Sequence, residues 1–369
     1  DSSSNDERAG TQNRCDVIPR IPIPDCADRN SVRLSDQALM EHFMRRDELV
    51  TVFGGSGFVG RHVVRALAKR GARVRVPMRR PHLGQELRVL GDVGQIQLVQ
   101  ANVRFPDSVH AALADADAVV NLVGVLSERG TQNFRALHID AARSIAKAAA
   151  ARGITRMAHI SAIGAAPKGA LYARTKYQGE QAVREALPSA AILRPSIVFG
   201  PEDAFFNRFA QMATTSPLMP LIGGGKTKFQ PIFAGDVAHA ICAALAMPSA
   251  QGRVFELGGP RIYSFKQLLQ FVMAETHRQR PFLALPFFAA QPLGLLLQWG
   301  FKLIPFADPP LTGDQVTMLH RDNVVGLDKQ AGVIADLGVH ALESVEAVVP
   351  SYLWRFRPYG QFQTTQKPA

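Results

Sequence analysis

Two side chains one helical turn apart, Tyr172 and Lys176, are candidates for chemistry at a carbonyl group or a ribose. On a helix, residues four positions apart project from the same face. A lysine ammonium group placed there can lower the pKa of the phenol and hydrogen-bond a ribose hydroxyl. Ser161 precedes Tyr172 by eleven residues, and its hydroxyl could polarise a substrate carbonyl. A serine at a strand end is more often a simple loop hydroxyl, so these residues permit proton transfer without establishing it.

The remaining polar residues give weaker signals. His138 and Asp140 lie two positions apart, so on a helix they face different sides, and we interpret both as ordinary polar positions. We interpret Asp236 as a helix cap or an orienting residue. We predict no metal site, because neither close spacing nor accompanying histidines are found around the three cysteines, Cys15, Cys26 and Cys242.

A glycine-rich turn joins the apolar segment 49–53 to a segment with helical spacing of apolar residues that ends at Gly71. In such a turn the first glycine permits the tight bend, the second lets the backbone approach a pyrophosphate, and the third allows the helix to pack closely. Amide groups at the helix N-terminus add favourable charge for a phosphate. The sequence therefore predicts a dinucleotide site on Gly54, Ser56, Gly57, Phe58, Val59 and Gly60.

The end of the second predicted strand indicates which dinucleotide is bound. Proteins that bind NAD use an acidic residue at this position to hydrogen-bond the adenosine ribose. Here Arg79 and Arg80 occupy the position, and no acid is adjacent. A guanidinium group binds phosphate oxygens with matched charge, so the pair favours the 2′-phosphate of NADP(H). The alternative is that both arginines are solvated surface charges.

The elements that must position these residues alternate between strand and helix. After the first strand we predict strands at 72–78, 96–101, 118–123, 156–161 and 190–196, and helices at 106–114, 134–152 and 172–186. Alternating units with short links predict an α/β fold with a doubly wound parallel Rossmann sheet covered on both faces. The pattern becomes less regular afterwards, which indicates a smaller, mostly C-terminal α/β lobe.

Four regions follow from this pattern. We expect an extended N-terminal arm over 1–47, a Rossmann core over 48–200, an interleaved substrate-side or docking lobe over 201–350, and a C-terminal tail over 351–369. The arm is polar and proline-containing without sustained periodicity. The chain begins at Asp1, and removal of a mitochondrial presequence would explain that start.

The chain is strongly basic, with 42 Lys and Arg against 31 Asp and Glu and a formal charge of +11. This balance favours an anionic partner without selecting among phospholipid, an acidic protein surface, nucleic acid and a phosphorylated ligand. The segment 281–306 is almost entirely apolar but is interrupted by prolines. It predicts a helix–turn–helix that docks on a membrane surface, anionic lipid or a partner protein, or that caps its own lobe.

Several motifs resemble those of atypical and extended short-chain dehydrogenase/reductases. They include Asn121 to Gly124 at the end of the fourth predicted strand, the Tyr172–Lys176 pair, and the segment LRPSIVFGP at 193–201. The resemblance implies cofactor contacts along strand ends, with adenine near the third strand and nicotinamide near the sixth. The residues concerned are Asn102, Val103, Leu122, Val123, Gly124, Tyr172, Lys176, Pro195 and Ile197.

Narrower features resemble one branch, the NADPH-binding accessory subunits of respiratory complex I and their alphaproteobacterial relatives. These are LGDVGQIQLV at 90–99, PLIGGGKTKFQPIFAGDVA at 220–238 and FELGGPRIYSFKQLLQF at 255–271. The resemblance implies a structural NADPH that supports assembly or stability, and Ser161, Tyr172 and Lys176 as vestigial rather than catalytic residues. It also implies subunits of the peripheral arm and membrane junction as partners.

The same resemblance implies a location on the matrix side of the mitochondrial inner membrane, with the cytoplasmic face of an alphaproteobacterial membrane as the alternative. A free NADP-dependent reductase or epimerase remains the alternative function, supported by the intact Tyr172–Lys176 pair. A third alternative, a Rossmann-type RNA-binding or regulatory protein, is supported by the positive charge alone, and we expect no nucleic-acid partner.

Overall fold

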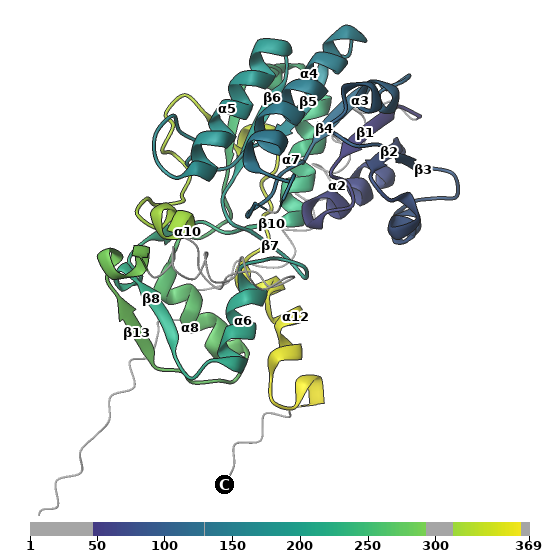
Figure 1. Cartoon of the computed structure of the whole chain (residues 1–369). Helices are drawn as coiled ribbons and strands as arrows, with labels where there is room; N and C mark the ends of the chain where they lie inside the picture. The colour runs from purple at the N-terminus through teal and green to yellow at the C-terminus, as the bar shows by residue number, and fades with distance from the viewer. Residues whose placement is uncertain (1–46, 129, 293–312, 363–369) are drawn as a thin grey trace, which may run out of the picture.

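An eight-stranded sheet, in which all neighbouring strands run parallel, forms the centre of the computed structural model (Figure 1). The structure describes residues 47–128, 130–292 and 313–362. The strand order changes direction beside β1, which pairs with β2 on one side and β4 on the other. In spatial order the strands are β3 (Ile96–Gln100), β2 (Arg73–Met78), β1 (Leu49–Phe53), β4 (Ala118–Asn121), β5 (Arg156–Ile160), β6 (Ala191–Pro195), β11 (Val254–Leu257) and β14 (Gly332–Val333).

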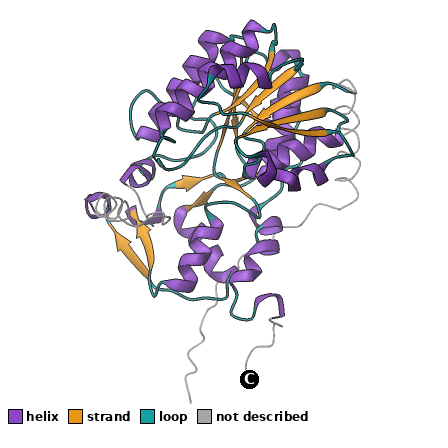
Figure 2. Cartoon of the chain, turned by 45° about the vertical axis from the view of Figure 1, so that its right-hand side comes forward, coloured by secondary structure: helices purple, strands orange, loops and turns teal. Residues whose placement is uncertain are grey.

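Helices cover both faces of this sheet (Figure 2). On one face, α2 (Phe58–Lys69) and α7 (Ala234–Ala246) share an apolar cluster with the sheet. On the other face, α3 (Pro106–Ala112), α4 (Ala141–Ala151) and α5 (Leu171–Ala186) bury a second cluster. The predicted doubly wound parallel sheet is confirmed. A crevice for ligands is expected at the carboxyl ends of the strands, where the strand order changes direction.

The helix predicted at 134–152 has two parts. A π-helical turn over Arg135–Asp140 precedes α4 and continues into it. Such turns insert an extra residue into a helix and often occur at functional sites. This turn contains the buried His138, whose contacts are described below.

The chain crosses repeatedly between the sheet and the lobe (Figure 1). It leaves the sheet after β6, returns as α7 and β11, leaves again, and returns as β14. Asp236, in the first turn of α7, is buried and accepts a hydrogen bond of 2.9 Å from the backbone N–H of Glu343. It therefore orients a distant segment against α7, in agreement with its interpretation as an orienting residue.

The lobe contains three small two-stranded pairs and several helices. Their apolar side chains form one aromatic-rich cluster, which includes Phe199, Phe206 and Phe265. The strand pairs are β7 (Val198–Phe199) with β10 (Ile232–Phe233), β9 (Lys228–Phe229) with β12 (Tyr263–Ser264), and β8 (Met219–Ile222) with β13 (Phe282–Leu285). The helices are α6 (Phe206–Thr215), α8 (Phe265–Glu275), α10 (Gly313–Met318), α11 (Val345–Val348) and α12 (Pro350–Leu353).

The core of the lobe continues past residue 350. Tyr352 and Leu353 are buried in the aromatic cluster, and the Tyr352 hydroxyl donates a hydrogen bond to the buried carboxylate of Asp203. The same carboxylate accepts from the Phe206 amide at 2.6 Å, at the start of α6. The first residues of the predicted C-terminal tail are therefore packed into the lobe.

The helix–turn–helix predicted for 281–306 is wrong at its beginning. Residues Phe282–Leu285 form β13, which pairs in parallel with β8. Pro281 and Pro286 bracket this segment and restrict the residues around it to extended or turn conformations. Residues 293–306, like the arm over 1–46 with Cys15 and Cys26, lie outside the described residues. Among the helices that the structure describes, none is long and apolar enough to cross a membrane.

Candidate functional site

The glycine turn lies between β1 and α2, and its backbone geometry depends on glycine at two positions. Gly54 has a φ of +81°, a left-handed conformation that side chains disfavour. A Cβ atom on Gly60 would lie 2.2 Å from the carbonyl oxygen of Gly54, so only glycine allows the helix to approach the turn. Gly57 is exposed, and a Cβ there would meet only that same oxygen, at 3.3 Å. The turn therefore leaves open space above Gly57.

The first amides of α2 have no side-chain acceptor among the described residues. The N-cap residue is Gly57, and the first turn contains no acidic residue. Such amides carry partial positive charge and form a natural phosphate site. Beside them, Ser56 and Val59 are half-buried, while the ring of Phe58 packs 2.9 Å from the position that a Cβ on Gly200 would take.

Arg79 and Arg80 directly follow β2, which is the neighbour of β1 in the sheet. Both side chains are exposed, and neither makes an ion pair or a side-chain hydrogen bond with another residue in the described ranges. Guanidinium groups at this edge can bind the phosphate of a nucleotide whose pyrophosphate occupies the glycine turn. The same exposure also fits the alternative of solvated charges.

The other predicted cofactor contacts lie at the carboxyl ends of three further strands. One of them is already engaged in a turn, because Asn102 Oδ1 accepts a hydrogen bond of 3.2 Å from the Arg104 amide. Gly124 lies beside the lysine of the pair, since a Cβ there would be 3.5 Å from Lys176 Nζ. The residues are Asn102 and Val103 after β3, Leu122, Val123 and Gly124 after β4, and Pro195 and Ile197 at and after the end of β6.

Tyr172 and Lys176 project from the N-terminal half of α5, as their spacing predicts. Lys176 is buried, and its Nζ donates a hydrogen bond of 2.9 Å to the carbonyl oxygen of Ile160 at the end of β5. Burial lowers the pKa of Lys176 to about 8, against the opposing charge of Glu180. Burial also raises the pKa of the Tyr172 phenol to about 12, so the phenol is protonated at neutral pH.

His138 belongs to this site, and its interpretation as an ordinary polar position is wrong. The ring is 2% exposed and packs edge-on against Tyr172, with 5.4 Å between centroids. Its Nδ1 lies 3.0 Å from Thr175 Oγ1, and its Nε2 accepts a hydrogen bond from the Val125 amide. These partners indicate a neutral ring protonated on Nδ1, and burial lowers the pKa to about 3. Asp140 is exposed, in agreement with its interpretation.

The apolar pattern contains a signal that could have revealed His138. It occupies the same helical stripe as Phe134, Leu137 and Ala141, all of which are buried. The close approach of α5 completes the arrangement, because a Cβ on Gly179 would lie 2.2 Å from the His138 carbonyl oxygen. Sequence spacing alone does not show that Gly179 faces this turn.

Two buried polar atoms at the end of β5 have no hydrogen-bond partner in the described part of the chain. They are Ser161 Oγ and His159 Nε2. The other ring nitrogen of His159, Nδ1, lies 3.1 Å from the Asn121 amide group, and burial lowers the pKa of His159 to about 3. Ser161 directly follows Ile160, which binds Lys176. Buried polar groups are normally paired, so the Ser161 hydroxyl is suited to a ligand group at this edge.

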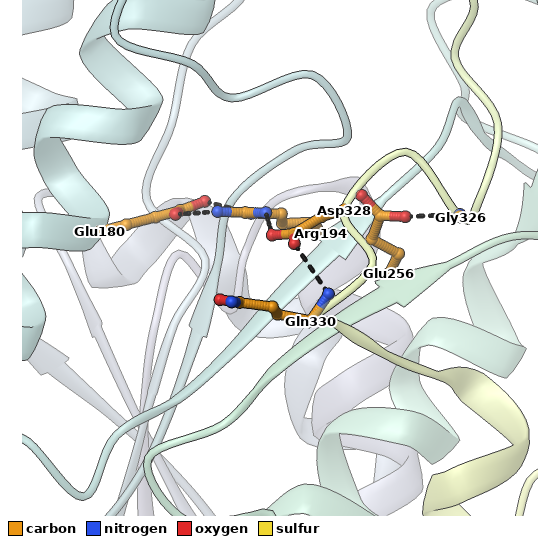
Figure 3. Close-up of polar contacts among 6 residues, drawn as sticks. All are labelled: Glu180, Arg194, Glu256, Gly326, Asp328 and Gln330. Atoms are coloured by element: carbon orange, nitrogen blue, oxygen red, sulfur yellow. Dashed lines mark hydrogen bonds and ion pairs between the residues drawn. The ribbon is translucent and has the colours of Figure 1, made fainter.

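An ion-pair network centred on the buried Glu180, missed by the sequence analysis, anchors the next turn along the same face of α5 (Figure 3). The Arg194 guanidinium donates two hydrogen bonds to Glu180, from Nε at 2.8 Å and from Nη2 at 2.7 Å. Its Nη1 binds Asp328 at 2.8 Å. Glu180 is fully buried, and Arg194 precedes the predicted contact Pro195 on β6. The network therefore holds α5 against the strand that ends at the site.

The parallel sheet, the glycine turn and the polar groups gathered at the strand ends together define a Rossmann fold, the class of fold that holds dinucleotides at this edge. In the residues that the structure describes, no cluster of histidine, cysteine, aspartate and glutamate is suited to hold a metal ion. The open turn at Gly57, the uncapped amides of α2 and the unpartnered Ser161 hydroxyl fit a phosphorylated, hydroxyl-rich ligand.

Comparison with known proteins defines the family. Residues 50–258 match the NAD dependent epimerase/dehydratase family. The chain is 35% identical over 308 residues to the mitochondrial NADH dehydrogenase (ubiquinone) 1 alpha subcomplex subunit 9 of Mus musculus, covering 81% of this chain and 79% of that protein. The chain therefore belongs to the epimerase/dehydratase family and, within it, to the family of these NADH dehydrogenase subunits.

Two further similarities are more limited. The chain is 35% identical over 175 residues to the ceramide reductase of Caulobacter vibrioides, covering 47% of this chain and 54% of that protein. The NAD complex of the UDP-glucose 4-epimerase of Thermus thermophilus superimposes with a TM-score of 0.62 at 18% identity, covering 84% and 99% of the two chains. The second similarity shows the fold alone.

Proposed function

We propose that the chain is an accessory subunit of NADH:ubiquinone oxidoreductase that binds NADPH as a structural cofactor and supports assembly or stability of the complex. The observation that carries this proposal is the 35% identity over 308 residues to an NADH dehydrogenase subunit. Its partners would be other subunits of the peripheral arm and the membrane junction. The names of the relatives favour the mitochondrion, and we propose the matrix side of the inner membrane.

The residues of the site fit NADPH in an extended conformation across the strand ends. Gly54, Gly57 and Gly60 would hold the pyrophosphate, with the first amides of α2 as donors. Arg79 would bind the 2′-phosphate, since it is exposed and charged and stands where NAD-binding proteins have an acid. Tyr172 would contact the ribose of the nicotinamide. When bound, NADPH supplies a hydride donor.

The electrostatics of α5 support a structural role for that cofactor. A tyrosine that transfers protons near neutral pH needs a lowered pKa. Burial instead raises the pKa of Tyr172 to about 12, and Lys176 binds a backbone carbonyl. His138 is held neutral between Thr175 and the Val125 amide. The arrangement favours holding a ligand over moving a proton.

Isolation of the native protein tests the proposal. We expect it to co-migrate with a membrane complex of many subunits, and to release NADPH in near-stoichiometric amounts on denaturation. Mass spectrometry of the released nucleotide distinguishes NADPH from NADH. A monomer or dimer that carries no nucleotide would contradict the proposal.

A free NADP-dependent reductase is the second candidate, favoured by the intact Ser161, Tyr172 and Lys176 and by the similarity to a ceramide reductase. Tyr172→Phe separates the two functions. In a structural site it removes one contact worth roughly 0.5–1.5 kcal/mol, leaving ubiquinone reduction by the assembled complex nearly unchanged. In a reductase it suppresses NADPH oxidation with carbonyl substrates about 10²–10⁴-fold. Tyr172-dependent turnover by the isolated protein would establish the second candidate.

A further inference from the structure

The helix that carries Tyr172 has no cap of its own. The residue at the N-cap of α5 is Ala170, whose methyl side chain cannot accept a hydrogen bond. The first amides of a helix nevertheless need acceptors. The carboxylate of Asp314 supplies them, because its two oxygens accept hydrogen bonds from the Leu171 amide at 2.6 Å and from the Tyr172 amide at 3.0 Å. Asp314 lies 143 positions after Leu171 in the sequence.

Asp314 reaches α5 from the lobe, where it is firmly held. It lies in α10, and Val316 of the same helix is buried in a small apolar cluster with Ile222 of β8 and Ala290. Thr317 also donates a hydrogen bond of 3.0 Å to the Gly313 carbonyl within α10. The carboxylate is therefore a fixed contact between the lobe and the first turn of α5.

The two residues of the pair differ in how they depend on this contact. Tyr172 is the second residue of α5, in the turn where helices fray first. Lys176 lies one turn further on and has its own anchor, the carbonyl of Ile160. Loss of the carboxylate would therefore leave the Tyr172 amide without its acceptor while leaving the anchor of Lys176 in place.

We propose that Asp314 is a positioning residue for Tyr172 and that it thereby fixes the nicotinamide half of the bound nucleotide. This inference rests on the proposed function, in which Tyr172 contacts the nicotinamide ribose. The charge of the carboxylate strengthens this contact, since an anion is attracted to the positive end of the helix dipole at the N-terminus. The lobe thus positions Tyr172 through the side chain of Asp314.

Binding of NADPH to the full-length protein tests the inference. Asp314→Ala should weaken the binding of NADPH about three- to tenfold, because loss of the helix cap disturbs only one contact with the nucleotide, that of Tyr172. Asp314→Asn keeps one acceptor oxygen, and we expect it to recover part of that loss. Adenosine 2′,5′-bisphosphate, which carries only the adenine half, should bind with unchanged affinity.

A double-mutant cycle separates positioning from general stabilisation of the fold. If Asp314 acts through Tyr172, Asp314→Ala should weaken NADPH less than twofold further in a Tyr172→Phe background. The matched control is Ser264→Ala, which removes the cap of α8 in the lobe. It should lower the melting temperature to a similar extent and leave NADPH affinity unchanged.

Three outcomes would overturn the inference. They are an unchanged affinity of Asp314→Ala for NADPH, an equal loss of affinity for NADPH and for the bisphosphate, and full additivity with Tyr172→Phe. If the unmodified protein binds no NADPH, the proposed function fails and this inference fails with it. If the unmodified protein binds NADPH and any of the three outcomes is observed, only the role of Asp314 is refuted.

Discussion

The two ends of the candidate site are built in different ways. At the glycine turn, the contacts among the glycines are local: the Gly57 amide donates to the Gly54 carbonyl at 3.0 Å, and Gly60 packs on the same carbonyl. At the Tyr172 end, the contacts join residues far apart in the sequence. His138 and Thr175 are 37 positions apart, and Arg194 and Asp328 are 134 apart.

This difference indicates which variants separate binding from folding. The surface above Gly57 is open, so changes there alter the ligand site and leave the protein core alone. The groups around α5 belong to the core themselves, because Glu180 and His138 are almost completely buried. Changes there should alter the stability of the protein even without nucleotide.

The largest effect is expected at the buried end. Glu180→Gln leaves the Arg194 guanidinium without its fully buried anionic partner, and breaking such a pair costs roughly 3–5 kcal/mol of unfolding free energy. Urea unfolding of the nucleotide-free protein measures the loss. Asp328→Asn, at the exposed partner of the same arginine, should cost about 1 kcal/mol or less. Equal losses in both variants would remove the distinction between the two partners.

At the open end, Gly57→Val should abolish nucleotide binding and hardly change the nucleotide-free protein. The φ of −79° and ψ of 176° suit any residue, and the nearest contact of a new Cβ is a single oxygen at 3.3 Å. Nucleotide at a hundred times its dissociation constant stabilises the protein by about 2.7 kcal/mol, and this increment should vanish. Thermal unfolding with and without NADPH measures it. Gly60→Ala is the contrasting variant, because it should destabilise the nucleotide-free protein as well.

A smaller effect is expected where the adenosine would lie. Arg79→Asp should weaken the binding of NADPH about ten- to a hundredfold, because it removes a charge-assisted contact worth roughly 1.5–3 kcal/mol. NADH lacks the 2′-phosphate, so its affinity should change far less. Arg73→Asp, at the other end of β2, is the charge-matched control. Equal affinity of the unmodified protein for both nucleotides would show that Arg79 does not select between them.

The smallest effect is expected on the stability of the protein at low pH. The folded-state pKa of His138 is about 3, below the value of about 6.5 expected when the chain unfolds. Between these two values the unfolded state therefore binds more protons than the folded state. The stability that the neutral His138 ring contributes is fully present above pH 6.5 and is lost as the pH falls below 6.5. From pH 6.5 to 5.5 the loss approaches about 1 kcal/mol. His138→Gln should reduce the slope of unfolding free energy against pH by that share, and an unchanged slope in this variant would contradict a neutral, buried His138.

The sequence predicted the sheet and the glycine turn because both produce recognisable patterns in residues that are neighbours in the chain. The apolar run at 49–53, the three glycines and the helical spacing after them are local features. The spacing of Tyr172 and Lys176 likewise follows from one helical turn. These features required no knowledge of distant contacts.

The missed features are those that need the tertiary arrangement. The partner of Arg194 could not be chosen among 31 acidic residues, and Asp314 gives no local sign that it caps α5. The strand β13 was missed because a short apolar run between prolines fits a strand or a helix equally well. Its pairing with β8, about 60 residues earlier, decides between them.

The repeated crossing between sheet and lobe also bears on how the protein is made. The last strand of the sheet, β14, comes from residues 332–333, so most of the chain must be synthesised before the sheet has all its strands. A nascent chain ending near residue 200 would have β6 as an open edge and α2 without α7 against it. Open strand edges recruit other chains. Until β14 is added, the unfinished sheet is therefore expected to expose a strand edge and apolar helix surface that favour association with other chains.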